Sequence, residues 1–308
     1  MIVSQLLLPL LTVLLTLGLG VYLLKVIDGA IAAAVSGHKL GNPLLAPLQQ
    51  AAWLWLQQRN TTEKPDTLSW RLAPALYLGL AAAGLAVVPW SASLIPSDLS
   101  TGIVLWGSVE ALATVVIFLH GWSANALLPL IGAYRYVALG LSYILISMFV
   151  LIGVALPAES LQMSAVIESQ RELWNVIRQP LGLPLFLIVG LGVSFWGPLN
   201  FADSADLAGG TEAEVSGRSR LVWTFAQAAM LVAFSAVAAT AFLGGWLGPW
   251  LPGPMWLLLK SALVLTALLW LGHMLARVAP ERLVTVAWLL FLPLAFVDLV
   301  WAGLEALR

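Results

Sequence analysis

The most informative segment of the sequence runs from Asp203 to Pro254 and reads DSADLAGGTEAEVSGRSRLVWTFAQAAMLVAFSAVAATAFLGGWLGPWLPGP. Its first part is rich in acidic residues and glycine, whereas the part from Leu221 onward is an uncharged apolar run that ends in LGGW. An apolar run of about 20 residues is long enough to cross the hydrocarbon core of a bilayer as a helix. The segment therefore predicts a polar loop that leads into a membrane-spanning helix.

The composition of the whole chain points the same way. Of its 308 residues, 61% are hydrophobic and 9% are charged, and the mean hydropathy is +0.95. Because a soluble domain has roughly a quarter of its residues charged, this composition indicates an integral membrane protein and excludes a water-soluble enzyme. The sequence contains no cysteine, so thiolate ligands for zinc or an iron–sulfur cluster are excluded, and we expect any electron carrier to be on a partner.

Eight apolar runs are candidates for membrane-spanning helices. They are continuous rather than alternating, which disfavours a β-barrel. The first run has neither a basic leader nor a small-residue cleavage site, so it is predicted to be a retained span. We expect an all-α integral membrane protein with about eight transmembrane helices and one polytopic domain over residues 1–308. The runs lie near Ser4–Val26, Leu72–Trp90, Gly102–Leu119, Tyr136–Leu156, Leu181–Trp196, Leu221–Leu243, Met255–Leu275 and Leu283–Ala302.

The basic residues predict the orientation of these helices. Loops after the odd-numbered runs hold or border ten of the fourteen Lys and Arg residues: Lys25, Lys39, Arg59, Lys64, Arg71, Arg135, Arg218, Arg220, Arg277 and Arg282. The positive-inside rule then places these loops in the cytoplasm and both chain ends outside. Residues 42–58, NPLLAPLQQAAWLWLQQ, suit an interfacial helix in the first cytoplasmic loop, with a packed loop as the alternative. Residues 164–179 predict a short surface helix on the other side.

Ionisable residues within the spans are the first candidates for chemistry, because a charge there costs at least ~2.5 kcal/mol without a partner or water. Glu110, Lys260 and Asp298 are candidates for a proton path, and Glu110 lies nearest the middle of its span. Each could instead snorkel to the interface or pair two helices. His120 and His273 share this ambiguity.

Motifs of soluble enzymes are absent: the sequence has no phosphate-binding loop, H-E-x-x-H motif or G-x-S-x-G turn. The densest acidic cluster is Asp203, Asp206, Glu212 and Glu214, directly followed by Arg218 and Arg220. By composition alone it is a solvated loop, and three scattered histidines without cysteine predict no metal site.

Several spaced motifs occur in the same order as in one family of membrane proteins. They are G-W-x-x-N at Gly121, Trp122 and Asn125; G-x-x-R at Gly132 and Arg135; S-Y at Ser142 and Tyr143; E-x-S-G at Glu214, Ser216 and Gly217; AATAFLGGW at 238–246; and P-G-P-x-W-x-x-x-K from Pro252 to Lys260. The chain thereby resembles the quinone-site membrane protein of NADH:quinone oxidoreductase (respiratory complex I), which is its H subunit. Membrane-bound [NiFe]-hydrogenases contain a related subunit. The resemblance covers roughly residues 71–302.

The chain departs from this family at charged positions. Ile144 stands where the family has a glutamate after Ser-Tyr, and VSFWGP at 193–198 lacks the family's Glu-x-x-Arg pair before the proline. Asn200 replaces an aspartate, and Gly272 and Leu289 replace basic residues. Because the missing groups are thought to carry protons in the family, the resemblance implies a divergent member with an altered or weakened proton path.

The resemblance implies a membrane subunit of a complex I-like or energy-converting hydrogenase-like respiratory complex in the bacterial inner membrane. Such a chain is non-catalytic alone, anchors the peripheral electron-transfer arm, and contributes to a quinone cavity and a proton path. Asp203, Asp206, Glu212 and Glu214 are expected to border the cavity mouth, and Arg135, Arg218 and Arg220 to contact the arm, with His38 and Lys39 facing the same arm. Quinone and lipid are the expected ligands, with no metal and no covalently bound cofactor. Expected partners are peripheral iron–sulfur or hydrogenase-like subunits and antiporter-like membrane subunits, not nucleic acid.

Two alternatives stay open. A purely structural anchor of such a complex is favoured by the missing charges. A secondary transporter is disfavoured because the sequence shows neither inverted repeats nor paired broken helices around a midplane site.

Overall fold

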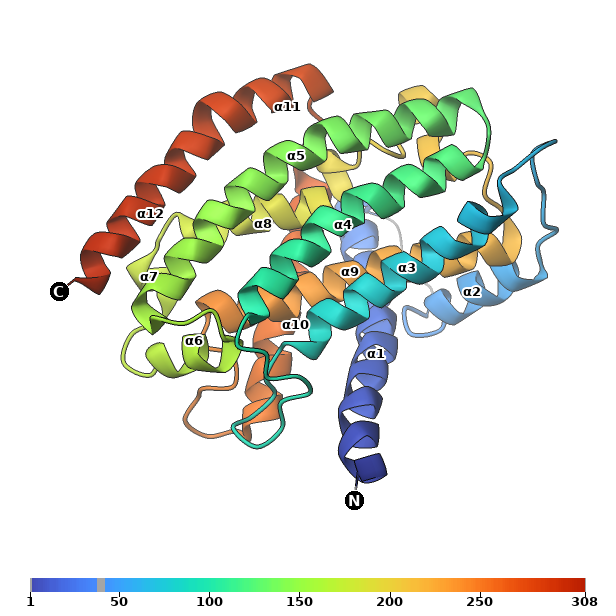
Figure 1. The fold of residues 1–308 in the computed structure, drawn as a ribbon. Coiled ribbons are helices and arrows are strands. Elements are labelled where there is room, and N and C mark those ends of the chain that lie inside the picture. The colour runs from blue at the N-terminus through green and yellow to red at the C-terminus, as the bar shows by residue number, and fades with distance from the viewer. Residues whose placement is uncertain (1, 38–41, 308) are drawn as a thin grey trace.

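The computed structural model describes residues 2–37 and 42–307, which are helical and contain no β-strand (Figure 1). Within these described ranges, seven helices are long and apolar enough to cross a membrane. They are α1 (Ile2–Ser36), α3 (Thr67–Ala86), α4 (Gly102–Ser123), α5 (Leu127–Ala155), α9 (Gly217–Phe242), α10 (Gly253–Met274), and a final helix made of α11 (Pro280–Val286), the π-helical turn η5 (Ala287–Phe291) and α12 (Leu292–Ala306). The prediction of an all-α integral membrane protein is confirmed.

Shorter elements connect the long helices. They are α2 (Ala46–Leu56), α6 (Met163–Ser169), α7 (Asn175–Arg178), α8 (Gly182–Val193) and the 3-10 turns η1 (Leu156–Ala158), η2 (Gly197–Leu199), η3 (Ala205–Leu207) and η4 (Gly210–Glu212). The helix predicted within residues 42–58 is present as α2. The single surface helix predicted over 164–179 is wrong, because Gln170 interrupts it. The buried Gln170 side chain donates to the Thr240 carbonyl (3.0 Å) and accepts from the Gly244 amide (3.0 Å).

The predicted span at residues 181–196 corresponds to α8, which has 12 residues. At 1.5 Å per residue such a helix is roughly 18 Å long, shorter than the ~30 Å hydrocarbon core. The segments that flank α8 nevertheless contact opposite halves of α9. Gln170 before it binds Thr240 near the C-terminal end of α9, and Asp203 after it binds Gln227 in the N-terminal half. The number of crossings and the orientation stay predictions.

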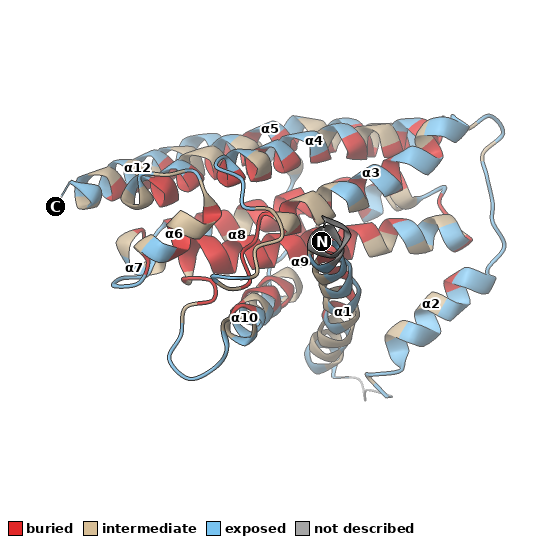
Figure 2. Ribbon diagram, turned by 60° about the horizontal axis from the view of Figure 1, so that its bottom comes forward, coloured by how far each residue is buried: buried red, intermediate tan, exposed pale blue. Residues whose placement is uncertain are grey.

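Helix α9 forms the centre of the bundle, as the buried residues in Figure 2 show. Many of its residues are alanine, and small side chains allow neighbouring helices to approach closely. Larger side chains fill the remaining space: Phe234 stacks on Phe186 of α8 at 4.5 Å between ring centroids, and Trp106 of α4 lies 5.8 Å from the same ring. The core is thus built around one helix that touches α1, α2, α3, α8 and α10.

The final helix contains a π-helical turn directly before Pro293. Proline lacks an N–H and clashes with the preceding turn of a regular α-helix, and a π-turn is one way in which a helix relieves this conflict. At this turn, Trp288 Nε1 donates to Ser142 Oγ of α5 at 3.1 Å, which joins the final helix to the bundle.

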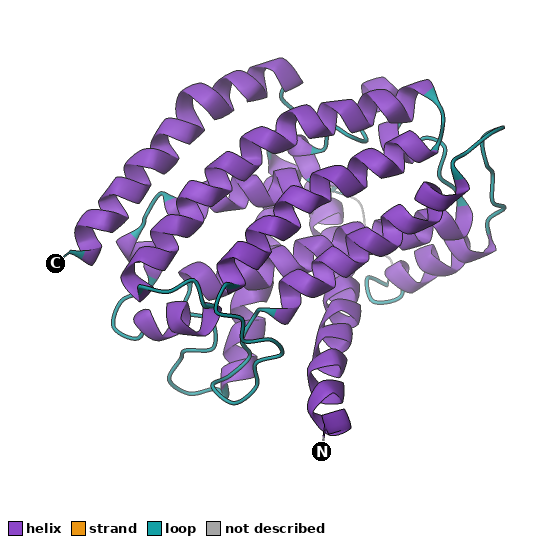
Figure 3. Cartoon of the chain, viewed as in Figure 1, coloured by secondary structure: helices purple, strands orange, loops and turns teal. Residues whose placement is uncertain are grey.

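Loops gather at the ends of the bundle (Figure 3). At one end the connections 57–66, 124–126 and 197–216 bind one another. The Asn60 amide donates to Ser216 Oγ at 2.7 Å, and Asn125 Nδ2 donates to the Lys64 carbonyl at 3.0 Å. The connection 275–279 shares a cavity with the 197–216 connection. We call this end the loop end. It carries the connections that the positive-inside rule assigns to the cytoplasm.

Candidate functional site

The acidic connection between α8 and α9, residues 197–216, is docked against α4 and α5 through main-chain contacts. The Thr211 amide donates to the Ala202 carbonyl at 3.1 Å, and Gly210 has a left-handed φ of +52° that a side chain would strain. Gly132 of α5 lies so close to the Ala202 carbonyl that a Cβ there would collide with it. The glycine of the G-x-x-R motif therefore allows the connection to approach α5.

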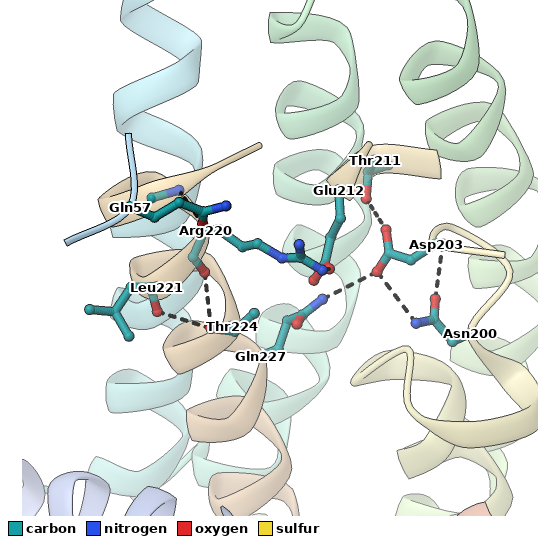
Figure 4. A network of polar contacts seen from close by, with 10 residues as sticks. Gln57, Asn200, Asp203, Thr211, Glu212, Arg220, Leu221, Thr224 and Gln227 are labelled. Carbon is teal, nitrogen blue, oxygen red and sulfur yellow. Dashed lines mark hydrogen bonds and ion pairs between the residues drawn. The ribbon is translucent and has the colours of Figure 1, made fainter. Parts of the chain in front are cut away.

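Asp203 is the centre of a hydrogen-bond network within this connection (Figure 4). Its carboxylate accepts from Thr211 Oγ1, from Gln227 Nε2 at 3.3 Å and from Asn200 Nδ2 at 3.4 Å. Its own amide donates to Asn200 Oδ1 at 3.0 Å. The network joins the connection to α9 and fixes the carboxylate next to Glu212.

The surrounding protein raises the pKa of Asp203 to about 7. Burial is the main cause because it disfavours the charged form, and the nearby charge of Glu212 adds to it, while the three hydrogen bonds act in the opposite direction. A carboxyl group with such a pKa can bind and release a proton near neutral pH.

The pKa values of Asp203 and its neighbour Asp206 are shifted in opposite directions, so the two residues are predicted to change stability with pH in opposite ways. The folded chain keeps a proton on Asp203 that the unfolded chain releases near pH 4, so stability is lost as pH rises from about 4 to 7. Hydrogen bonds from Ser204 and Arg135 instead lower the pKa of Asp206. The charged Asp206 therefore stabilises the folded chain at neutral pH, and this stabilisation is lost in acid. In the detergent-solubilised chain, the melting temperature of Asp203→Asn relative to that of wild type should therefore be higher at pH 8 than at pH 5. Asp206→Asn should fall below wild type at both pH values, and a pH-independent difference for Asp203→Asn would contradict the assignment.

The other predicted loop residues divide into two groups. Arg135 is paired with Asp206 at 2.7 Å, and Arg220 with Glu212 at 3.4 Å. Glu212 is joined in this way to the edge of the Asp203 network, where Figure 4 shows its carboxylate close to the Arg220 guanidinium. Outside the network, Arg218 lies over the Trp55 ring of α2 at 4.4 Å.

Glu214, the remaining predicted acid, is exposed and forms no ion pair or side-chain hydrogen bond with the residues described. His38 and Lys39, predicted to face the peripheral arm, lie outside the described residues.

A cavity of about 250 Å³ lies between α1, α2 and α9. Its lining is mainly apolar and includes Val21, Leu54 and Phe225, with the polar groups of Lys25 and Thr224 among them. Lys25 is within electrostatic reach of Glu212, and Thr224 lies one turn before Gln227 on α9. The polar part of the cavity is therefore next to the Asp203 network.

Buried tyrosines lie between the Asp203 network and Glu110. The hydroxyls of Tyr77 and Tyr136 both donate to the Val193 carbonyl at the end of α8, at 3.0 and 2.8 Å. Tyr77 is within electrostatic reach of Asp203, and Tyr136 of Glu110. Glu110 itself is fully buried on α4 and accepts a hydrogen bond from Trp106 Nε1 at 2.7 Å.

The structure separates the other two proton-path candidates from this group. Lys260 donates to the carbonyls of Gly245 (3.1 Å) and Leu247 (2.7 Å) in the connection between α9 and α10, at the end opposite the loop end. Asp298 of α12 accepts from the Leu181 amide at 3.2 Å, where a carboxylate stabilises the N-terminus of α8. Glu110, Lys260 and Asp298 share no hydrogen-bond partner within the described ranges.

Comparisons with known proteins decide the family. The sequence profile of the family described as NADH dehydrogenase matches residues 4–303. The chain belongs to the family of NADH-quinone oxidoreductase H subunits. It is 34% identical over 240 residues to the NADH-quinone oxidoreductase H subunit designated 1 of Rhodopseudomonas palustris strain HaA2, covering 78% of this chain and 75% of the relative.

Two further relatives agree with this assignment. The H subunit designated 1 of Rhodopseudomonas palustris strain BisB5 is 32% identical over 274 residues, covering 87% of this chain and 86% of the relative. The H subunit designated 2 of Cereibacter sphaeroides strain ATCC 17029 is 34% identical over 237 residues, covering 76% and 74%. Membership of the H-subunit family implies a multi-pass membrane subunit of a multi-subunit complex.

The structure gives the motifs shared with the H-subunit family a physical role. Asn125 of G-W-x-x-N has φ +47° and forms the turn between α4 and α5, Arg135 of G-x-x-R pairs with Asp206, and Lys260 binds the LGGW connection. The sequence analysis did not identify Thr211 and Gln227, which donate hydrogen bonds to the Asp203 carboxylate. An uncharged glutamine within an apolar helix was the available signal for Gln227, because a buried amide requires a polar partner.

Proposed function

We propose that this chain is the membrane subunit of a complex I-like respiratory complex that anchors the peripheral electron-transfer arm, receives a quinone and carries protons along an altered path. The observation that carries the proposal is the cavity between α1, α2 and α9. Thr224 in its wall lies one helical turn before Gln227, which donates to the buried acid Asp203. A quinone has an apolar tail and a polar head with two carbonyl acceptors. The mainly apolar lining suits the tail, and the Lys25 ammonium is a donor for a carbonyl.

The position of α2 supports entry from the bilayer. Trp53, Trp55 and Leu56 expose 61%, 53% and 82% of their surface, which is typical of a helix that lies at the membrane interface. Because α2 forms one wall of the cavity, a ligand dissolved in the membrane can reach it without crossing water. The chain has no cysteine ligand for a redox centre, so electrons must come from the arm. Arg218, Arg220 and Glu214 at the loop end provide polar contacts for that arm.

The altered proton path is supported by the groups between the cavity and Glu110. Asp203 exchanges a proton near neutral pH, and Tyr77 and Tyr136 place two hydroxyls between this acid and Glu110. Both hydroxyls donate to the Val193 carbonyl, so in this proposal each turns from that carbonyl toward a neighbouring group or water to pass a proton. In this proposal Glu110 takes the role of the acid that Ile144 does not supply.

One observation favours the structural-anchor alternative. Phe195 packs between Tyr77, Tyr136 and Trp223, with ring centroids 5.8, 5.7 and 5.8 Å away. This aromatic cluster fills the interior beside VSFWGP, where the family pattern has a charged pair. A chain that only anchors the arm would keep this packing and would neither bind quinone nor conduct protons.

Filling the cavity tests quinone binding. A Cβ at Gly18 meets no atom within 4 Å, and this residue lines the cavity, so Gly18→Phe places a ring there without moving the backbone. A ring in this space excludes the quinone tail, so we expect at least about a tenfold rise in the KM for quinone, which is about 1.4 kcal/mol of binding free energy. The assay is NADH-driven reduction of decylubiquinone by the purified complex, with a water-soluble electron acceptor to monitor the arm alone.

The matched control is Gly29→Phe on the same helix. Gly29 also has open space around its Cβ position but does not line the cavity. We expect wild-type quinone reduction from this variant. If Gly18→Phe also keeps the wild-type KM in an assembled complex, quinone does not occupy the cavity and the anchor role is favoured.

A further inference from the structure

Asp28 of α1 and His273 of α10 form a hydrogen-bonded pair between two membrane-spanning helices. His273 Nε2 lies 2.8 Å from Asp28 Oδ1, although the residues are 245 positions apart in the sequence. The side chains expose 28% (His273) and 25% (Asp28) of their surface, so the pair is accessible from one side and enclosed on the other. Neither residue belongs to the network around Asp203.

The accessible side of the pair lines a separate cavity of about 340 Å³. Trp196 and Arg277 form other parts of its wall, and residues 274–279 at its edge are exposed. Because a water molecule occupies roughly 30 Å³ in the liquid, the cavity has room for several waters. The pair can therefore exchange protons with the solution at the loop end.

The next charged residue along α1 from the pair is Lys25. This residue lies one helical turn before Asp28 on α1, and its ammonium is 5.1 Å from the centroid of the Trp196 ring. It is within electrostatic reach of both Asp28 and Glu212. Lys25 thus lies within the electrostatic reach of the pair on one side and of Glu212, at the edge of the Asp203 network, on the other, without a direct ion pair with either acid among the described residues.

We propose that the Asp28–His273 pair is a proton-binding site that takes protons from the solution at the loop end and delivers them, through Lys25, to Glu212 and Asp203. This inference rests on the proton path proposed above. Imidazole is suited to the first step because histidine exchanges its proton near neutral pH. His273 binds a proton from water and releases one to the Asp28 carboxylate along their hydrogen bond. Water molecules then carry an ammonium proton from Lys25 to Glu212 and a replacement proton from Asp28 to Lys25, so the chain of groups returns to its starting state.

The charged groups around the pair give proton transfer a direction. Lys25 on α1 and Arg277 after α10 are positive, and Glu212 in the 197–216 connection is negative. Glu212 carries the negative charge at the inner end of this series of groups, so it attracts a proton that leaves the pair inward. The pair is thus placed to load a proton and pass it on.

A hydrogen bond that only holds α1 against α10, which we call a structural clip, would use the same contact. The test must therefore separate proton exchange from hydrogen bonding. The double variant Asp28→Asn with His273→Gln keeps a donor and an acceptor but cannot exchange protons. The swapped variant Asp28→His with His273→Asp keeps both titratable groups. As a control, Glu168→Gln with Arg171→Gln removes an exposed ion pair next to α6, at the opposite end of the bundle.

The readout is the rate of proton uptake and the number of protons moved per electron by the whole complex in vesicles at pH 8, with assembly checked by native gel. A positioned acid–base group accelerates proton transfer by about 10²-fold or more, so the amide pair is expected to slow uptake at least about tenfold. The swapped pair should recover most of the rate, and the control should match wild type.

Each other outcome overturns the inference. Wild-type uptake by an assembled amide pair shows that Asp28 and His273 are not on the path, even if the complex pumps. Failure of both the amide pair and the swapped pair to assemble shows a structural clip. Absence of pumping by the wild-type complex refutes the proposed proton path itself and is recognised before any variant is compared.

Discussion

Replacing Lys260 with methionine should be the most destabilising single change among the charged residues of the spans. The Lys260 ammonium donates to two main-chain carbonyls and lies 4.4 Å from the Trp174 ring and 5.5 Å from the Trp256 ring. A buried carbonyl that loses its donor costs about 1–3 kcal/mol, and a desolvated cation–π contact adds up to ~2 kcal/mol. We expect a loss of about 3 kcal/mol or more, measured as a lower melting temperature of the solubilised chain and less assembled complex.

The matched control for this change is Lys64→Met. Lys64 is an exposed residue of a connection, and surface substitutions of this kind usually stay within about 0.5 kcal/mol. An unchanged melting temperature for Lys260→Met would contradict the structural role of the ammonium. A variant that is stable but no longer pumps protons would return Lys260 to the proton path.

Glu110→Gln should abolish or strongly lower the number of protons pumped per electron while electron transfer continues. Glutamine keeps the size of the side chain and the acceptor for Trp106 Nε1, 2.7 Å away in the wild type, but it cannot ionise. Folding should therefore survive, and only proton exchange should be lost. The measurement is proton pumping by the reconstituted complex, with assembly checked by native gel and electron transfer by quinone reduction.

Asp298→Asn is the comparison that makes this result specific. Asparagine keeps an acceptor for the Leu181 amide at the start of α8, so a capping role predicts unchanged pumping. Equal losses in the two variants would place Asp298 on the path as well. An unchanged pumping ratio for Glu110→Gln in an assembled complex would remove Glu110 from the path and favour the anchor role.

Much of the fold could be predicted because membrane spans depend on local composition. Each long apolar run became a helix, and boundaries moved mostly where polar residues extend a helix beyond the apolar core, as at α1, which continues to Ser36. The break between α6 and α7 could not be predicted, because helical spacing continues through Gln170. Its buried side chain binds the end of α9, which is a tertiary contact without a local signal.

The site was only partly predictable for the same reason. The acidic cluster was visible as a dense group in the sequence, but its members have different environments: Asp203 is enclosed by Thr211 and Gln227, whereas Glu214 is exposed. Spacing cannot distinguish them, since the difference depends on how the connection packs against α5 and α9. Proximity of Asp28 to His273 likewise depends on how α1 and α10 pack.

The central position of α9 has a consequence for the order in which the chain is made. Synthesis runs from the N-terminus, so α1, α2, α3 and α8 leave the ribosome before α9, the helix on which they pack. Until residues 217–242 arrive, Phe186 and Trp106 lack the Phe234 ring that they contact in the finished bundle. The helices α3, α4 and α5 can pack on one another before α9 is made. The surfaces of α1, α3 and α8 that contact α9 stay uncovered until then, which leaves the incomplete chain accessible to quality-control proteases. Nascent chains that stop before Gly217 should be degraded faster than chains that stop after Phe242.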